Sequence, residues 1–510
     1  MHIRYSIFIG FIGITISTYA VESAPFIIDD DNVRSEVVVQ YLNDNYHITH
    51  RQNPNAQKHP ENLDININDN YIHSQSYIQN PFLWLNKGGG TQYVSESTMK
   101  DQNFAERLFA DGTWDVYGYS GIQQNTNRPV SYNISSTLFG QTGSVAGFSL
   151  GGAFVIGNPF IQNVTTSEGY PPYVFMTSEQ YNQLSEGYLE YQYSHIVQAD
   201  VGFIGINNSP FLAANYYSDQ SSAVTYQGGL ININPGDGWL LTVIGINGAA
   251  YPGTTGFTGN TLYNPGSIQG IPTGYDQGSN GTLAMGAIYY TPNNLYNVRL
   301  WSYHFDNYAN LVYADNSIKF PIGQDGNTYF TLGGQGGTEW GNQPDILGSK
   351  GLGIISSNFW GAQAAFNYNW FSLTMGYEDA WGPENAFGHG AIVSPYTYNE
   401  NVDPMYANSW MTSLVQKASS GQMYIITPTL RFMDNSLSIA PSYSEVLNTV
   451  ADLPDQEADL VINYSVAQIK GLKFFGVYAY MWQPNSITYK GNVLYGHNIG
   501  TALFMAEYLY

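Results

Sequence analysis

Short runs that alternate between apolar and small or polar residues recur from about Ala110 to Tyr510. In the clearest run, one face carries Trp360, Ala362, Ala364, Phe366 and Tyr368. The other face carries Gly361, Gln363, Ala365, Asn367 and Asn369. After a turn at Asn369 and Trp370, the alternation resumes over residues 371–378. A period of two residues is that of a β-strand, so this stretch predicts a β-hairpin with one apolar and one small or polar face.

The same pattern predicts further strands, while helical periodicity is almost absent. A second hairpin covers residues 424–443, with its turn at Met433–Ser436. Other predicted strands cover residues 189–194, 197–203 and 296–301, together with a strand that ends at Tyr290. Residues 472–481 are apolar on both faces and leave their periodicity ambiguous. The chain is therefore predicted to be all-β.

The predicted connections alternate between short and long. The turns at Asn369–Trp370, Met433–Ser436 and Pro292–Asn294 are short, whereas residues 251–281 and 381–420 form long Gly-, Asn- and Pro-rich connections. Short turns at one end and long loops at the other are typical of an up-and-down antiparallel barrel in an outer membrane, with the short turns on the periplasmic side.

Charge is scarce, which favours a membrane barrel over a soluble sandwich. Charged residues are 11% of the 510, against about 25% in ordinary soluble chains. A soluble sheet carries Lys and Glu on its polar face. In a membrane barrel a charge on the lipid face costs about 2–4 kcal/mol at mid-membrane, and the lumen accepts Ser, Thr, Asn and Gln. The formal net charge of −23 argues against nucleic-acid binding, and the absence of Cys excludes disulfides and thiolate chemistry.

Both ends of the chain carry export signals. Residues 1–20 have a basic Arg4, an apolar run over Ile7–Ile16 and small residues before Ala20, which predicts a signal peptide cleaved after Ala20 or, as a second candidate, after Ala24. The apolar run is about half the ~20 residues that a membrane-spanning helix needs. The last strand alternates up to Tyr508-Leu509-Tyr510 and ends on an aromatic residue. This ending resembles the terminal strand of Gram-negative outer-membrane proteins, which implies recognition by the barrel-assembly machinery.

Three stretches resemble the OprD family of substrate-specific outer-membrane porins. They run from Ala199 through Asn208-Ser209-Pro210-Phe211 to Gly229, from Trp301 to Asp315, and from Glu457 to Leu472. The resemblance implies an 18-stranded channel with inward-folded loops that admits small organic solutes. The family also has a ladder of lumenal Arg, but here the mature chain has six Arg and the corresponding loop reads Tyr217-Ser218-Asp219-Gln220-Ser221.

Strand phase and this resemblance together select the pore residues. Asp219 lies in the candidate constriction loop, and Glu190, Asp200, Arg299 and Arg431 fall on lumenal positions, as does Glu378. The acidic excess predicts a preference for cations, because carboxylates raise the local cation concentration.

Two other motifs are weighed against plainer interpretations. Gly147-Phe148-Ser149-Leu150-Gly151 matches the GxSxG hydrolase elbow, but its Ser lies in an alternating strand instead of a strand-to-helix turn, which favours an ordinary lumenal serine. His195 and His304 are its candidate partners. His47 and His50, with His59 and His73, lie in an Asn-, Asp- and Gln-rich stretch, which favours a solvated extension over a metal site.

The sequence thus predicts three parts: a signal peptide (1–20), an N-terminal segment that is periplasmic or partly plugs the lumen (21–108), and an outer-membrane β-barrel (109–510). Its predicted function is passive diffusion of small solutes with a preference for cations. No catalytic residue, metal or cofactor is predicted, the partners are the lipid bilayer and the solutes, and the barrel is a monomer or a trimer. The alternatives are a barrel lipase or protease that uses Ser149, and an adhesin that acts through its long loops.

Overall fold

The structure is a computed structural model that describes residues 36–42, 45–51, 103, 105, 107, 109 and 113–509. Within the last range it leaves out residues 126–129, 163–179, 194–195, 207–208, 213–224, 237, 251–256, 258–278, 292–294, 323–327, 343–352, 393–403, 411, 416–419, 434, 449–453, 470, 483–487, 490–491 and 494–497. The predicted signal peptide and Asp219 lie outside the described residues.

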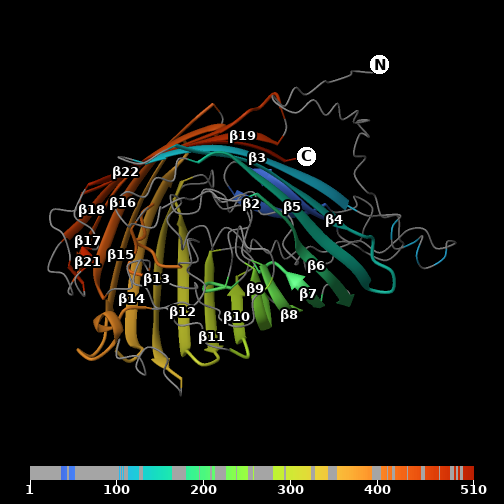
Figure 1. Cartoon of the computed structure of the whole chain (residues 1–510), viewed down its shortest axis with the longest axis horizontal. Helices are drawn as coiled ribbons and strands as arrows, with labels where there is room; N and C mark the ends of the chain where they lie inside the picture. The colour runs from blue at the N-terminus through green and yellow to red at the C-terminus, as the bar shows by residue number, and fades with distance from the viewer. Residues whose placement is uncertain are drawn as a thin grey trace.

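Eighteen antiparallel strands close into a barrel in which sequence neighbours are also spatial neighbours (Figure 1). They are β3 (Thr113–Asn125), β4 (Val130–Gln141), β5 (Phe148–Gln162), β6 (Tyr181–Tyr193), β7 (Val197–Ile204), β8 (Thr225–Gly236), β9 (Trp239–Ala250), β10 (Thr282–Tyr290), β11 (Tyr296–Phe305), β12 (Ala309–Pro321), β13 (Thr328–Gly341), β14 (Ser356–Tyr368), β15 (Phe371–Trp381), β16 (Gly421–Phe432), β17 (Leu437–Asn448), β18 (Pro454–Ser465), β19 (Leu472–Trp482) and β22 (Ile499–Leu509). The predicted all-β barrel, including the strand number implied by the resemblance, is confirmed.

Three smaller elements complete the described structure. β1 (Glu36–Leu42) and β2 (Asn45–Arg51) form a separate two-stranded sheet. β20 (Thr488–Tyr489) and β21 (Asn492–Val493) form another, and Phe387–His389 is a short 3-10 helix. His47 and His50 lie in β2, where they pair with Gln40 and Val37 of β1, and His59 and His73 fall outside the described residues.

The alternation in the sequence appears as alternating burial. Along β9, Leu240, Thr242 and Ile244 are buried, whereas Leu241 and Val243 are exposed on the other face. The outer face exposes many large apolar side chains, including Leu184, Val201, Leu300, Tyr478 and Phe504, each more than half exposed. A soluble protein rarely leaves so large an apolar surface uncovered. The outer wall is therefore a surface for lipid, and the inner wall carries the polar side chains.

The connections fall into two sets at opposite ends of the barrel. One end carries residues 142–147, 194–196, 237–238, 291–295, 322–327, 369–370, 433–436 and 466–471, none longer than six residues. The other end carries the long connections 163–180, 205–224, 251–281, 342–355, 382–420 and 483–498, together with three short ones, 126–129, 306–308 and 449–453. The tightest turn places Asn369 at φ 40°, a left-handed conformation that Asn tolerates better than most residues. As predicted, every long connection lies at one end and the other end has short turns alone; three short connections also lie at the long-loop end.

The C-terminal strand closes the barrel. β22 pairs with β19 on one side and with β3 on the other, and Figure 1 shows β22 and β3 side by side. Leu503, Met505 and Glu507 are buried on its inner face, while Ala502 and Phe504 are exposed. The predicted phase of this strand is confirmed. Among the described residues, no helix has the length and hydropathy that a membrane crossing requires.

Candidate functional site

Two stretches of the long connections turn into the barrel interior. The first, segment A, follows β7 and comprises residues 205–206 and 209–212. The second, segment B, belongs to the connection between β15 and β16 and comprises residues 404–410 and 412–415. Every residue of both segments is buried. Because both run inside a closed barrel, they occupy part of its interior.

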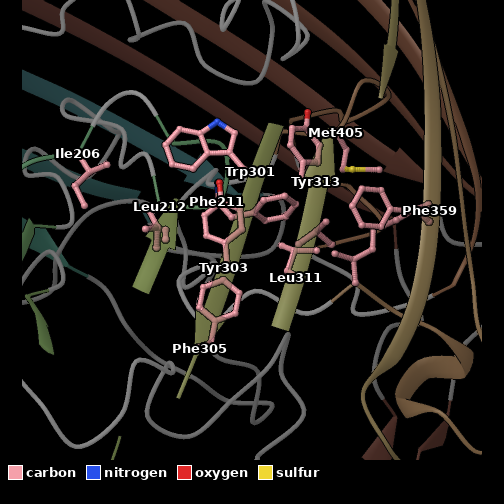
Figure 2. Packing of buried hydrophobic residues seen from close by; sticks show 14 of the residues in the cluster. Ile206, Phe211, Leu212, Trp301, Tyr303, Phe305, Leu311, Tyr313, Phe359 and Met405 are labelled. Carbon is pink, nitrogen blue, oxygen red and sulfur yellow. The ribbon is translucent and has the colours of Figure 1, made fainter. Parts of the chain in front are cut away.

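Segment A is held mainly by aromatic side chains of the wall. The Phe211 ring lies edge-on to Tyr303 of β11 and Tyr313 of β12, with ring centroids 5.7 Å and 5.4 Å away (Figure 2). The Tyr303 hydroxyl lies 3.0 Å from Ser209 Oγ and accepts a 3.4 Å hydrogen bond from the Phe211 N–H. Tyr226 of β8 donates a 2.9 Å hydrogen bond to the Leu212 carbonyl. Segment A is thus embedded in an apolar cluster on the lumenal side of the wall.

Segment B is held mainly by carboxylates of the wall. Glu378 of β15 accepts a 3.1 Å hydrogen bond from the Ala407 N–H. Glu457 of β18 accepts a 2.9 Å hydrogen bond from the Ser409 hydroxyl, which lies equally close to the Thr412 carbonyl within the segment. Asp459 of β18 accepts a 3.3 Å hydrogen bond from the Trp410 N–H. All three carboxylates are buried.

Further contacts spread segment B across the wall from β13 to β19. The Tyr406 hydroxyl donates to the Gly334 carbonyl of β13 at 3.3 Å. Burial, and secondarily the negative charge of Asp315, raises the pKa of Tyr406, so this hydroxyl stays a neutral donor. At the other end of the segment, the Trp410 ring packs at 5.8 Å on Phe475 of β19.

This packing explains the one strand whose periodicity was ambiguous in the sequence. β19 is apolar on its outer face because of lipid, and apolar on its inner face because Phe475, Val477 and Ala479 are buried. Phe475 lies directly beneath segment B. A strand that is covered on both faces is apolar along its whole length. Hydrophobic periodicity alone cannot distinguish such a strand from other buried elements.

The two segments are connected through a short relay of wall side chains. Tyr313, which touches Phe211, donates a 3.1 Å hydrogen bond to Gln335 of β13. Gln335 in turn lies 3.6 Å from the Met405 sulfur. Together, segments A and B contact the wall between β8 and β19, which is twelve consecutive strands of the barrel. The described inward segments therefore lie over one side of the barrel.

The adjoining strands carry a buried polar cluster around Glu190 of β6 and Asp200 of β7, which are direct cross-strand partners, and β7 in turn pairs with β8. Four neutral side chains donate hydrogen bonds to the Glu190 carboxylate, namely Gln141 (3.2 Å), Ser149 (3.1 Å), Gln198 (2.9 Å) and Gln192. Gln198 also lies 3.5 Å from Asp200. The two carboxyl groups thus contact each other as well as amides and a hydroxyl of the wall itself.

The two predicted basic residues of the lumen, Arg299 and Arg431, differ in burial and in their contacts. Arg299 is buried on the inner face of β11 and forms an ion pair with Asp315 of β12 at 2.7 Å, with two further hydrogen bonds from Nε. This pair is electrically neutral as a unit, so Arg299 does not act as an isolated positive charge. Arg431 is half-buried on β16, two residues before the turn at 433–436.

Ser149 of the hydrolase-like motif is buried in β5 and hydrogen-bonded to Glu190. His304, one of its candidate partners, is exposed on the outer face of β11, and His195 lies outside the described residues. Within the part of the chain that the structure describes, no group of His, Cys, Asp and Glu residues is arranged to hold a metal ion.

The residues that hold the inward segments were not among those selected from the sequence, Glu378 excepted. Glu457, Asp459 and Asp315 lie on inner-face positions that strand alternation could have identified. The partners of Glu457 and Asp459 lie far along the chain, at Ser409 and Trp410, whereas Asp315 pairs with Arg299 of the neighbouring strand. No local pattern connects such pairs, and the anchoring role therefore appears only in the folded chain.

The sequence matches no protein-family model and no curated protein. Among solved structures, outer membrane protein OpdK of Pseudomonas aeruginosa superposes with a TM-score of 0.62 at 12% identity, over 79% of this chain and 99% of OpdK. OccAB3 of Acinetobacter baumannii gives 0.62 at 12% identity, over 79% of this chain and all of its own length. OccK3 (OpdO) of P. aeruginosa gives 0.61 at 12% identity, over 80% and 97%.

The chain has the OprD-type barrel fold. The predicted resemblance is thereby confirmed at the level of the fold, which these outer-membrane proteins share over nearly their whole length. The sequence argues against the family's ladder of lumenal Arg, and among the described residues the buried cation is Arg299, which Asp315 neutralises.

Proposed function

We propose that this OprD-type barrel is an outer-membrane channel through which small solutes diffuse passively. The observation that carries the proposal is a closed barrel with a lipid-facing apolar exterior and a polar interior narrowed by two anchored inward segments. This combination suits a selective pore, since selectivity in channels comes from width and from the charges that line the path.

The finer proposal is that the channel prefers cations. Among the described residues, the buried ionisable side chains of the Asp, Glu, Lys and Arg types comprise nine carboxylates and the single guanidinium of Arg299. Glu190 and Asp200 lie on β6 and β7, where they contact each other and neutral side chains of the wall. Charges of one sign in a low-dielectric cleft focus their field along the path and raise the concentration of counter-ions.

Planar-bilayer recording tests both levels of this proposal. Purified protein should form channels, and the reversal potential in a KCl gradient should have the sign of K⁺ preference. Combining Glu190→Gln with Asp200→Asn should move the reversal potential towards zero, because two inner carboxylates are removed. Asp379→Asn is the matched control, since Asp379 hydrogen-bonds Gln422 near the end of β15, on the face opposite Glu378.

Absence of any channel activity in correctly folded barrels would overturn the porin proposal. Anion preference of the parent protein would overturn the charge argument and leave the channel proposal standing. Equal shifts in the Asp379→Asn and double variants would mean that overall charge, and not the inner cluster, sets the selectivity.

A further inference from the structure

Segment B contains backbone N–H groups that lie inside the barrel, away from any β ladder. Buried backbone donors need partners, because leaving them unpaired carries a large free-energy penalty. For Ala407 and Trp410 the partners are carboxylate oxygens of Glu378 and Asp459, and Ser409 adds its hydroxyl to Glu457. A carboxyl oxygen accepts such hydrogen bonds in either protonation state. The segment is therefore fastened at three successive points on β15 and β18.

The wall is also shaped to receive the segment. Gly376 lies two residues before Glu378 on the same inner face of β15. A Cβ atom at Gly376 would stand 2.1 Å from the carbonyl oxygen of Tyr406. Real Cβ atoms do not approach a backbone atom so closely, so any other residue at this position forces segment B away from the wall. The glycine and the carboxylates are independent features that both fix segment B at the same depth.

We propose that Glu378, Glu457 and Asp459 are positioning residues that clamp segment B against the lumenal wall and thereby set the width of the channel. The proposal rests on the proposed channel function and names the groups that determine its constriction. In this arrangement these carboxylates act on solutes through the backbone that they hold.

The clamp and a purely electrostatic role predict opposite changes in conductance. If the three carboxylates serve only as lumenal charges, removing them lowers the local cation concentration and therefore the conductance. If they clamp segment B, removing them frees the segment and widens the path. The triple variant Glu378→Ala, Glu457→Ala and Asp459→Ala should accordingly raise single-channel conductance by about twofold or more in KCl.

Two further variants separate the effect of hydrogen bonding on conductance from the effects of charge and of misfolding. The amide variant Glu378→Gln, Glu457→Gln and Asp459→Asn keeps an acceptor oxygen at each point, so it should return the conductance most of the way to the parent value. Gly376→Ala pushes the segment off the wall towards the pore axis by contact alone and leaves every charge in place, so it should lower the conductance without any loss of charge. Its matched control is Gly245→Ala on β9, where an added Cβ has nothing within 4 Å.

The labelling rate of a cysteine placed in segment B tests the clamp independently of conductance. The chain has no Cys, and Ser413 of segment B is fully buried, so Ser413→Cys gives one nearly isosteric probe. The Cys should react slowly with a water-soluble thiol reagent in the parent and at least about tenfold faster in the triple-Ala and Gly376→Ala backgrounds, because burial protects it until the segment opens. In the Gly245→Ala and Asp379→Asn backgrounds the rate should match the parent.

The outcomes distinguish the two proposals. Lower conductance of the triple-Ala variant together with unchanged labelling would overturn the clamp. Faster labelling in a protein that never conducts would support the clamp and overturn the channel function. If the triple variant fails to form heat-resistant barrels, the single variants Gly376→Ala and Ser409→Ala test the clamp instead, because neither removes a wall charge. Unchanged labelling in both variants would overturn the clamp.

Discussion

Segments A and B occupy the same interior by different chemistry. Segment A is held by the rings of Tyr303 and Tyr313 around Phe211 and by tyrosine hydroxyls. Segment B is held by the carboxylates of Glu378 and of β18. Ring packing depends on buried apolar area and tolerates small shifts, whereas a carboxylate clamp depends on the position of individual oxygens.

The difference between the two segments also shows that a carboxylate inside the barrel does not always interact with the solute. The carboxylates beneath segment B satisfy its donors, while those of Glu190 and Asp200 contact each other and amides and a hydroxyl of the wall. Residues of one chemical type thus have two roles in one lumen. The following changes separate the two segments, from the largest expected effect to the smallest.

Phe211→Ala should loosen segment A by about 3–5 kcal/mol, the usual cost of removing a buried ring. Phe211 is fully buried among three wall rings, so little can collapse into the space. Hydrogen–deuterium exchange of the peptide around residues 204–212 should accelerate strongly, and that of residues 404–415 should stay near the parent. Equal acceleration in both peptides would mean that the Tyr313–Gln335–Met405 relay couples the segments into one unit.

Ser409→Ala should loosen segment B by about 1.5–3 kcal/mol, the range for a hydrogen bond to a charged group. It removes the donor to Glu457 and changes no charge. The same exchange measurement should now accelerate residues 404–415 and leave segment A protected. Protection of segment B at the parental level would show that Glu378 and Asp459 suffice to hold it.

Tyr303→Phe should have the smallest effect, about 1 kcal/mol, because it deletes one neutral hydroxyl and keeps the ring. Ser209 and the Phe211 N–H lose their common partner, but the edge-on packing of Phe211 remains. A modest rise in the exchange rate of segment A is expected. A loss as large as that of Phe211→Ala would mean that hydroxyl contacts, and not ring packing, hold segment A.

Much of the barrel could be predicted from the sequence, because strand phase is a local property. The turn at Asn369–Trp370 and the inward positions of Glu190, Asp200, Arg299 and Glu378 follow from the period of two, and the structure agrees. The ion pair of Arg299 with Asp315 was missed because its partners face each other across a hairpin whose register the sequence does not fix.

The sequence by itself determined that the chain forms strands with one lipid-compatible face, and that its few charges lie on the other face or in the loops. Each of these properties needs only the alternation of side chains along one strand. Only the tertiary structure decided which carboxylates contact segment B and which side chains surround Glu190, because those contacts join residues up to about 49 positions apart. A carboxylate has the same inward phase in either role, and its function depends on the segment that folds over it.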